Sequence, residues 1–436
     1  MLMSRFIIIL KRSRALREAH RYAKSNFYLR YWSVFQKRDV GKCNDLTVSF
    51  KIIAPKRKKS MLKRIYIDNF RGLVNFEMNF DSINLFLGGN GTGKSTVFEV
   101  LRKIQTFVSG SKNLEEIFEY TDCTRWQTLP IQRFELEITG NGGHYKYEFA
   151  IRHNQDKNHV EYERLWFNNQ ILLKFEGDEV QLFREDTSEV KKILISLQLS
   201  KLSSLLILFS VETNGTKLAW FSKRMQRFII VQIIPSLMVD GSGKEEISLD
   251  FRMENFVSWY RYISQDQGKV SELMNILKNV LDGFVSFKFE QFSEKYRTLK
   301  LRFTTGEDRR NIIDYRFSEL SDGQKVLIAL YTLLYCTQSE DYTLCIDEPE
   351  NFLALPEIQP WVIQLYDFCI DGKIQALLIS HHPVLINYLL ASPIGYWFER
   401  QSNAPVRVKS ISNQEAENSG LPISELIARG WLYDPE

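Results

Sequence analysis

The chain has 436 residues, which is enough for one large α/β domain with a second domain inserted into it. Hydrophobic residues make up 44% and charged residues 25% of the chain, the proportions of an ordinary globular protein. The five cysteines show no C-x-x-C spacing. This scatter argues against a zinc hook or a disulfide framework and suits the reducing cytoplasm, where we expect the protein to be located.

Positive charge is concentrated at the start of the chain. Residues 1–60 contain sixteen Lys and Arg against three Asp and Glu, a net charge of +13. The remaining residues carry a net charge of −9, so the overall +4 comes from this segment alone. A strong non-specific DNA-binding protein is expected to carry net positive charge, and residues 61–436 do not. If these residues bind DNA, they would do so through a local basic patch.

The basic segment 1–60 does not read as a folded domain. Its apolar run at 6–10 is too short to cross a bilayer, and no small-residue cleavage pattern follows it. We interpret the segment as an extension upstream of a start at Met61, with a transit-like or nucleic-acid-binding arm as the alternative. No later segment predicts a transmembrane helix, so no membrane partner is expected.

The most informative stretch is residues 88–95, Gly-Gly-Asn-Gly-Thr-Gly-Lys-Ser. Two glycines five positions apart, followed by Lys and Ser, fit the phosphate-binding loop, here between an apolar strand and a helical run. Such a turn points backbone N–H groups and a helix N-terminus at an anion. Lys94 is expected to reach the terminal phosphates and the Ser95 hydroxyl to bind Mg²⁺. The predicted nucleotide contacts in this loop are Gly88, Asn90, Gly91, Gly93, Lys94, Ser95 and Thr96.

Three further motifs follow in chain order. Residues 320–324, Leu-Ser-Asp-Gly-Gln, come directly before a helical run. A later apolar strand ends in the carboxylates of Asp347 and Glu348, and the next apolar strand is followed by His381 and His382. Each motif alone is a weak signal. Their order, with each on the expected strand or loop, makes coincidence improbable.

Together these motifs resemble the ABC-type ATPase heads of the SMC, RecF and Rad50 group. Residues 62–73, Leu-Lys-Arg-Ile-Tyr-Ile-Asp-Asn-Phe-Arg-Gly-Leu, are similar to the first strands of that group. The chain looks closest to the compact predicted ATPases of the AAA_21 or OLD-like kind, which lack long coiled-coil arms. The resemblance covers residues 61–108 and 310–400 and implies an α/β P-loop NTPase core that takes ATP and Mg²⁺.

The resemblance also implies a role for each site residue. Asp347 would hold Mg²⁺ together with Ser95, Glu348 would polarise the attacking water, and His381 would contact the γ-phosphate region. A second group, the signature, would reach the γ-phosphate of a nucleotide held by the other protomer of a homodimer. Its residues are Ser321, Gly323 and Gln324.

The chain departs from the family pattern at three points. Asp322 stands where the signature usually has glycine, which places a carboxylate near the partner's triphosphate. No glutamine loop is evident, and Gln127 and Gln132 are candidates only. Because His382 adjoins His381, either histidine could be the one that contacts the γ-phosphate region.

The motif positions suggest five segments. Residues 1–60 are the basic extension, and residues 61–130 and 291–436 are the two lobes of the ATPase core. Residues 131–185 alternate in a strand pattern with a turn at Asn-Gly-Gly and predict a β-rich subdomain that begins with a hairpin. Residues 186–290 are expected to form a mainly helical insertion, a lid or arm.

Two classes of function remain open. The first is an ATP-hydrolysing switch that dimerises head to tail on ATP and acts in prokaryotic genome maintenance or anti-phage defence. We expect no fused nuclease module in the stretch after His381, so an effector nuclease or toxin, or DNA, would be a separate partner. The second is a nucleotide-sensing scaffold with little or no hydrolysis. A transporter subunit ranks third, because the first strands do not fit one.

Overall fold

The structure is a computed structural model that describes residues 61–436 apart from 155–157, 178, 184–189, 195–203, 207–215, 306–310, 339–340, 390–394, 403, 412–420 and 430–436. The predicted basic extension 1–60 lies outside the described residues. All the described residues belong to one unit, Pro55–Glu436.

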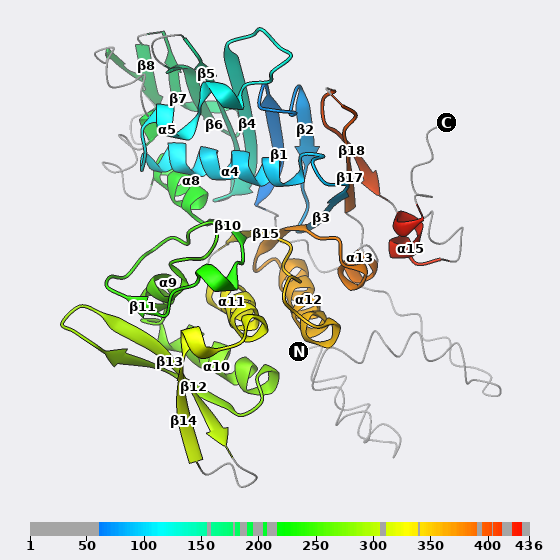
Figure 1. The fold of residues 1–436 in the computed structure, drawn as a ribbon. Helices are drawn as coiled ribbons and strands as arrows, with labels where there is room; N and C mark the ends of the chain where they lie inside the picture. Colours follow the sequence, from blue (N-terminus) through cyan, green and yellow to red (C-terminus); the bar gives the residue numbers. More distant parts are fainter. Residues whose placement is uncertain are drawn as a thin grey trace, which may run out of the picture. The chain divides into compact units, whose positions relative to one another are not determined.

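A six-stranded sheet is the centre of this unit (Figure 1). Its order is β10 (Phe228–Gln232), β15 (Thr343–Asp347), β16 (Gln375–Ile379), β3 (Ile83–Gly88), β17 (Gly395–Glu399) and β18 (Arg407–Ile411). The first five strands run parallel, and β18 pairs antiparallel with β17. The four strands β10, β15, β16 and β3 are buried on both faces, as strands of a covered parallel sheet must be.

Alternate residues of these strands belong to two different hydrophobic cores. On β3, Leu85 and Leu87 belong to one core and Phe86 belongs to the other. On β15, Ile346 belongs to the first of these cores and Cys345 to the second. The period of two follows from the pleat of a strand. The central sheet therefore lies between two packed layers.

The first layer contains an antiparallel sheet and the helix that follows the phosphate loop. The sheet order is β2 (Phe76–Asn79), β1 (Leu62–Asp68), β4 (Ile131–Gly140), β5 (Gly143–Arg152), β6 (His159–Phe167), β7 (Gln170–Glu176), β8 (Glu179–Phe183) and β9 (Val190–Leu194). Figure 1 shows α4 (Lys94–Ser109) across one face of this sheet, and its apolar face belongs to the core that the strands line. The apolar residues that α4 buries there recur every three or four positions, as on one face of a helix.

The predicted hairpin is confirmed as β4–β5, in which Ile138 pairs with Tyr145. Its turn residues Asn141 and Gly142 have φ of 48° and 80°. Positive φ at both central residues matches the twist of the flanking strands, which explains why Asn-Gly stands there.

The second layer packs helices and a small sheet against the other face. The helices are α9 (Phe256–Ile263), α10 (Gln267–Val280), α11 (Asp322–Thr337) and α12 (Leu355–Ile370). The sheet has order β11 (Gly241–Ser242), β13 (Arg297–Thr305), β12 (Phe284–Gln291), with β14 (Asn311–Arg316) also paired to β13. Shorter helices are α5 (Leu114–Ile117), α8 (Lys217–Gln226), α13 (Pro383–Leu389) and α15 (Ile423–Ala428), with 3₁₀ turns at Tyr120–Asp122, Pro235–Leu237 and Phe317–Glu319.

The segment 186–290, expected to be mainly helical, contains α8, α9 and α10 but also β9, β10, β11 and most of β12. Strand β10 belongs to the central sheet, where it pairs with β15. The apolar run 228–234 is compatible with a buried strand or a buried helix, and periodicity alone does not separate the two. Part of the expected insertion thus contributes to the sheet that carries the phosphate loop.

Within the described part of the chain, no helix combines the length and the apolar character that a membrane span requires. The α/β class, with a parallel core and a β-rich subdomain, is the one expected from the sequence.

Candidate nucleotide-binding site

The predicted motifs meet at the carboxyl edge of the central sheet. Strand pairing aligns Asp347 with Ile379 on the neighbouring strand β16, and Ile379 with Phe86 on β3. The residues that follow these positions are Glu348, His381 and the phosphate loop. Ligands of open α/β sheets bind at this edge, outside the carboxyl ends of the strands.

The phosphate loop has the backbone that its glycines permit. Gly88, Gly91 and Gly93 have φ of 136°, 75° and 98°, a range that favours glycine. A Cβ at Gly88 would lie 2.3 Å from the Phe398 carbonyl oxygen, and a Cβ at Gly93 would lie 2.9 Å from Val406 Cγ2. At Gly88 and Gly93, a side chain would therefore meet neighbouring atoms too closely, and the positive φ also favours glycine.

Helix α4 starts at Lys94 and has no side chain that caps its first N–H groups. These groups and the helix dipole favour an anion at this end of the helix. Lys94 Nζ donates hydrogen bonds to the carbonyl oxygens of Gly88 at 2.7 Å and Gly89 at 2.8 Å. Burial lowers the pKa of Lys94, against the opposing effect of Asp347 and Glu348. A phosphate would offer this partly desolvated cation a stronger acceptor than a carbonyl.

Ser95 and Asp347 provide the candidate metal ligands. Ser95 Oγ donates to Asp347 Oδ2 at 2.9 Å, and Asp347 is buried, which raises the pKa of its carboxyl. The described residues contain no cluster of three or more His, Cys, Asp or Glu side chains placed to hold a metal. A hydroxyl and one carboxylate fit Mg²⁺, which keeps waters and phosphate oxygens as its other ligands.

Glu348 and His381 face the loop across a shared cavity of about 540 Å³. Glu348 has φ of 50°, a sparsely populated region for a residue other than glycine, and its Oε2 accepts a hydrogen bond from Asn351 Nδ2 at 2.8 Å. Burial, followed by the charge of Lys94, lowers the pKa of His381, which favours the neutral ring. The residues that line the cavity are Leu87, Gly88, Gly89, Asn90, Glu348, His381, Ile386, Trp397 and Ile427.

His381, rather than His382, is the histidine that lines this cavity. His382 donates its backbone N–H to Ser380 Oγ at 3.0 Å. The geometry therefore favours His381 as the residue that would contact the γ-phosphate.

The signature residues are not among those that line the cavity. Ser321 caps α11: its Oγ accepts a hydrogen bond from Gln324 N at 3.3 Å, and Gln324 Oε1 accepts one from Ser321 N at 3.1 Å. Gly323 lies beside the loop after β15, since a Cβ there would be 3.0 Å from the Phe352 carbonyl oxygen. Asp322 is exposed in the first turn of α11. One copy of the chain thus leaves the signature available for contact with another molecule.

Sequence reasoning missed Gln232. This residue ends β10 and pairs in register with Asp347, so it lies at the same edge of the sheet as the metal ligand candidates. Its backbone N–H donates to the Phe251 carbonyl oxygen at 2.8 Å. The sequence pattern that could have identified Gln232 is an apolar run followed by an amide side chain, similar to the apolar run that ends in Asp347.

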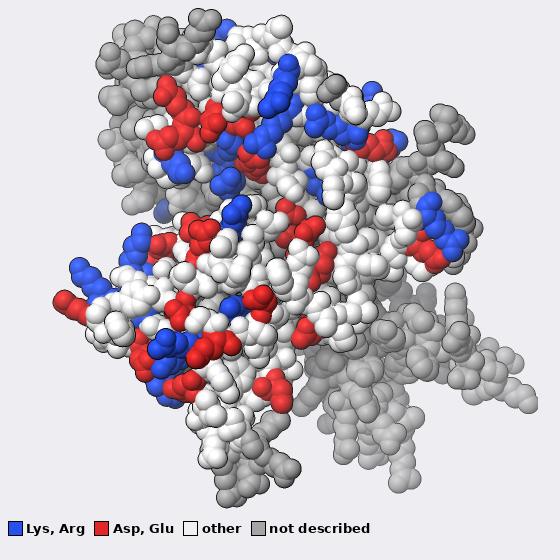
Figure 2. Space-filling view, in the orientation of Figure 1, with Lys and Arg blue, Asp and Glu red and all other residues white. Residues whose placement is uncertain are grey.

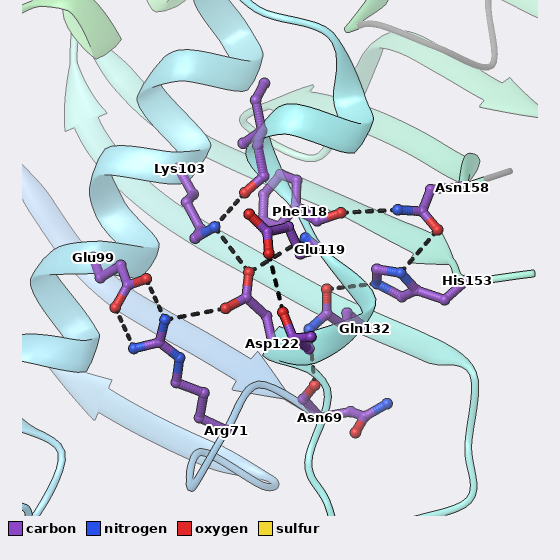
Figure 3. Close-up of polar contacts among 12 residues, drawn as sticks. Asn69, Arg71, Glu99, Lys103, Phe118, Glu119, Asp122, Gln132, His153 and Asn158 are labelled. Carbon is purple, nitrogen blue, oxygen red and sulfur yellow. Dashed lines mark hydrogen bonds and ion pairs between the residues drawn. The ribbon is translucent and has the colours of Figure 1, made fainter.

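The two glutamines proposed from sequence lie elsewhere. Gln132 is fully buried on β4, where its Nε2 donates to Asn69 O at 3.0 Å and its Oε1 contacts His153 Nε2 at 2.9 Å. Figure 3 shows this pair within a polar network that also ties the turn after β1 to α4, through the ion pair of Arg71 with Glu99. Gln127 lies in the loop before β4, with a buried Oε1 that has no hydrogen-bond partner among the described residues.

The parallel sheet, the glycine loop that leads into α4 and the acidic end of β15 define a P-loop ATPase fold. A family model described as "AAA domain, putative AbiEii toxin, Type IV TA system" (AAA_21) matches residues 83–387. The chain belongs to this AAA_21 family, which confirms the assignment to AAA_21-type predicted ATPases made from the motifs.

Two solved structures are similar to this chain at low sequence identity. The SMC head domain from Thermotoga maritima is 12% identical with a TM-score of 0.43; the match covers 81% of this chain and 99% of that one. The SMC head bound to the C-terminal winged-helix domain of ScpA is 11% identical with a TM-score of 0.47, over 82% and 99% of the two chains. No match was found among curated proteins.

Proposed function

We propose that this protein binds ATP with Mg²⁺ and hydrolyses it. The observation that carries the proposal is the contact of Ser95 with Asp347, beside a cavity that the phosphate loop, Glu348 and His381 share. Three strands far apart in sequence bring a phosphate cradle, two metal ligands and a candidate base to one place. Membership of the family supports a nucleotide as the ligand.

Each residue has a defined task in the proposed reaction. The loop N–H groups and Lys94 bind the β- and γ-phosphates and hold the γ-phosphate in line for attack. Glu348 accepts a hydrogen bond from the attacking water and polarises it. The neutral ring of His381 contacts the γ-phosphate, where charge develops in the transition state. Mg²⁺, when held by Ser95 and Asp347, neutralises phosphate charge.

We further propose that two copies close head to tail on ATP. The support is the signature, which caps an exposed helix end outside the cavity of its own chain. A second copy related by a two-fold axis would place Ser321, Gly323 and Gln324 on the first copy's γ-phosphate, and the reverse. The ATP-bound dimer would be the active state of the switch.

The proposed biological role is prokaryotic genome maintenance or anti-phage defence, with a separate effector nuclease, toxin or DNA as partner. The words "putative AbiEii toxin, Type IV TA system" in the family's description support a defence role. Figure 2 shows basic and acidic side chains interspersed on the visible face rather than one continuous basic surface. The net charge of −9 on residues 61–436 favours a protein effector over non-specific DNA as the first partner to test.

One observation favours the alternative, a nucleotide-sensing scaffold with slow hydrolysis. Asp322 is exposed beside Ser321, where its carboxylate would face a partner's triphosphate and oppose closure.

Release of phosphate from Mg²⁺-ATP by the purified protein, compared with Lys94→Ala, tests the main proposal. Turnover that requires Lys94 supports an ATPase. ATP binding that requires Lys94 without turnover would instead establish the scaffold.

A further inference from the structure

Glu350 connects the two loops that carry Glu348 and His381. It lies in the loop after β15, and its Oε1 accepts a hydrogen bond from Ser380 Oγ at 2.6 Å and one from the backbone N–H of His381 at 3.2 Å. Ser380 directly follows β16 and is fully buried. A single carboxylate oxygen therefore joins the loop that carries Glu348 to the loop that carries His381, called the histidine loop below.

The two loops leave the sheet together, because Glu348 N donates to the Ile379 carbonyl oxygen at 2.9 Å and extends the pairing of β15 with β16 by one residue. On the histidine side, the backbone N–H of Ser380 still donates to the Phe86 carbonyl oxygen of β3 at 3.5 Å. The Glu350 side chain provides a further contact between the two loops, directly at the backbone of His381. A change in this contact would move the ring that lines the cavity.

Glu350 itself is not among the residues that line the cavity. Its second oxygen, Oε2, is buried and has no hydrogen-bond partner among the described residues. The side chain is thus placed to hold a loop, since its Oε1 accepts the hydrogen bonds of Ser380 Oγ and His381 N. One acceptor oxygen is sufficient for this task, and the amide of glutamine offers the same acceptor.

We propose that Glu350 is a positioning residue for the reaction, which holds His381 against the γ-phosphate by accepting the hydrogen bonds of Ser380 Oγ and His381 N. The inference rests on the proposed ATPase function. Removal of the acceptor frees the histidine loop but leaves the phosphate loop and its contacts intact. We therefore expect turnover to depend on Glu350 and nucleotide affinity to be nearly independent of it.

The test compares Glu350→Ala, Glu350→Gln, His381→Ala and the double variant Glu350→Ala/His381→Ala. We expect Glu350→Ala to lower kcat by about tenfold to 100-fold, since a misplaced contact group costs that much. The dissociation constant for a fluorescent ATP analogue should change by less than about threefold. Glu350→Gln should retain most of the wild-type kcat, and the double variant should be no slower than His381→Ala alone, because both changes act through one group.

Glu357→Ala is the matched control. Glu357 Oε2 also accepts a backbone hydrogen bond, from Ala354 N at 2.8 Å at the start of α12, but Glu357 does not line the cavity. Wild-type kcat in Glu350→Ala, an equal fall in Glu357→Ala, or additive losses in the double variant would each overturn the inference. If Glu350→Ala does not fold, Ser380→Ala decides instead: it removes one donor and should lower kcat in the same direction.

A readout without turnover separates this inference from the proposed function. Histidine-selective ¹⁵N labelling gives six backbone amide signals, and loss of one in His381→Ala identifies His381. That signal should move in Glu350→Ala and stay close to its wild-type position in Glu350→Gln. An unmoved signal in Glu350→Ala overturns the inference, whether or not the wild type hydrolyses ATP. A wild type without turnover, in contrast, removes the proposed function alone.

Discussion

Ser95 Oγ donates a hydrogen bond to Asp347 Oδ2 at 2.9 Å, although 252 positions separate the two residues in the chain. Ser95 lies in the first turn of helix α4 and Asp347 ends strand β15, so the contact exists only because β3, β16 and β15 are neighbours in the sheet. The two oxygens are the protein ligands that Mg²⁺ would use. Several expected outcomes depend on this arrangement.

Loss of either ligand should raise the Mg²⁺ requirement. In Ser95→Ala and Asp347→Asn, half-maximal turnover is expected at about tenfold higher Mg²⁺ or more, the usual cost of a weakened metal site. A Mg²⁺ titration of phosphate release measures the effect. Ser109→Ala, at the other end of α4, is the control and should follow the wild type. An unchanged Mg²⁺ dependence in both variants would remove the metal assignment.

Lys94→Ala should weaken ATP binding by about tenfold or more, because the loop loses a buried cation that would pair with the phosphates. Calorimetry with a non-hydrolysable ATP analogue measures the affinity. Lys112→Ala, at an exposed lysine just beyond the C-terminus of α4, should bind as the wild type does. Equal affinity in Lys94→Ala and wild type would contradict the phosphate-loop assignment.

Glu348→Gln should bind ATP normally but hydrolyse it about 100-fold more slowly or worse, since the amide keeps the shape of the side chain but cannot polarise water. The variant should accumulate as a closed dimer with ATP, seen as a doubled mass in light scattering after size-exclusion chromatography. Turnover at the wild-type rate would place the catalytic carboxylate elsewhere.

The head-to-tail arrangement predicts complementation between two inactive proteins. Lys94→Ala retains its signature and Ser321→Arg retains its phosphate loop, so a mixed dimer contains one complete site. Phosphate release should recover partially when the two are mixed and should depend on total protein concentration. If subunit exchange is verified and no activity returns, independent composite sites are ruled out and strict two-site cooperativity or a signature inactive in trans remains.

Replacement by alanine should lower turnover at Gln232 and lower stability at Gln132. Gln232→Ala is expected to lower turnover about tenfold or more with little change in melting temperature, because it lies beside Asp347 at the sheet edge. Gln132→Ala removes the partner of Asn69 O and of His153 Nε2, and should cost about 1–3 kcal/mol of stability with turnover retained. Melting curves and phosphate release, measured on both variants, decide between the two glutamines.

The local motifs were predictable because each is contained in one strand–turn–helix unit. The glycines of the phosphate loop need their φ values whatever surrounds them, and the Asn141–Gly142 turn specifies its hairpin by the same logic. The acidic pair at the end of β15 is a weak signal by itself and was recognisable because it follows the phosphate loop and the signature in the expected order.

Other features required the tertiary structure. The apolar run that forms β10 fits a buried strand and a buried helix equally well. The sequence alone therefore did not place Gln232 beside Asp347. Glu350 and Ser380 each look unremarkable along the chain and become a contact only through the pairing of β15 with β16. Sequence by itself determined the conformations that depend on near neighbours. Only the tertiary structure decided which strand ends meet, because that choice is made by burial of both faces of the sheet rather than by any local preference.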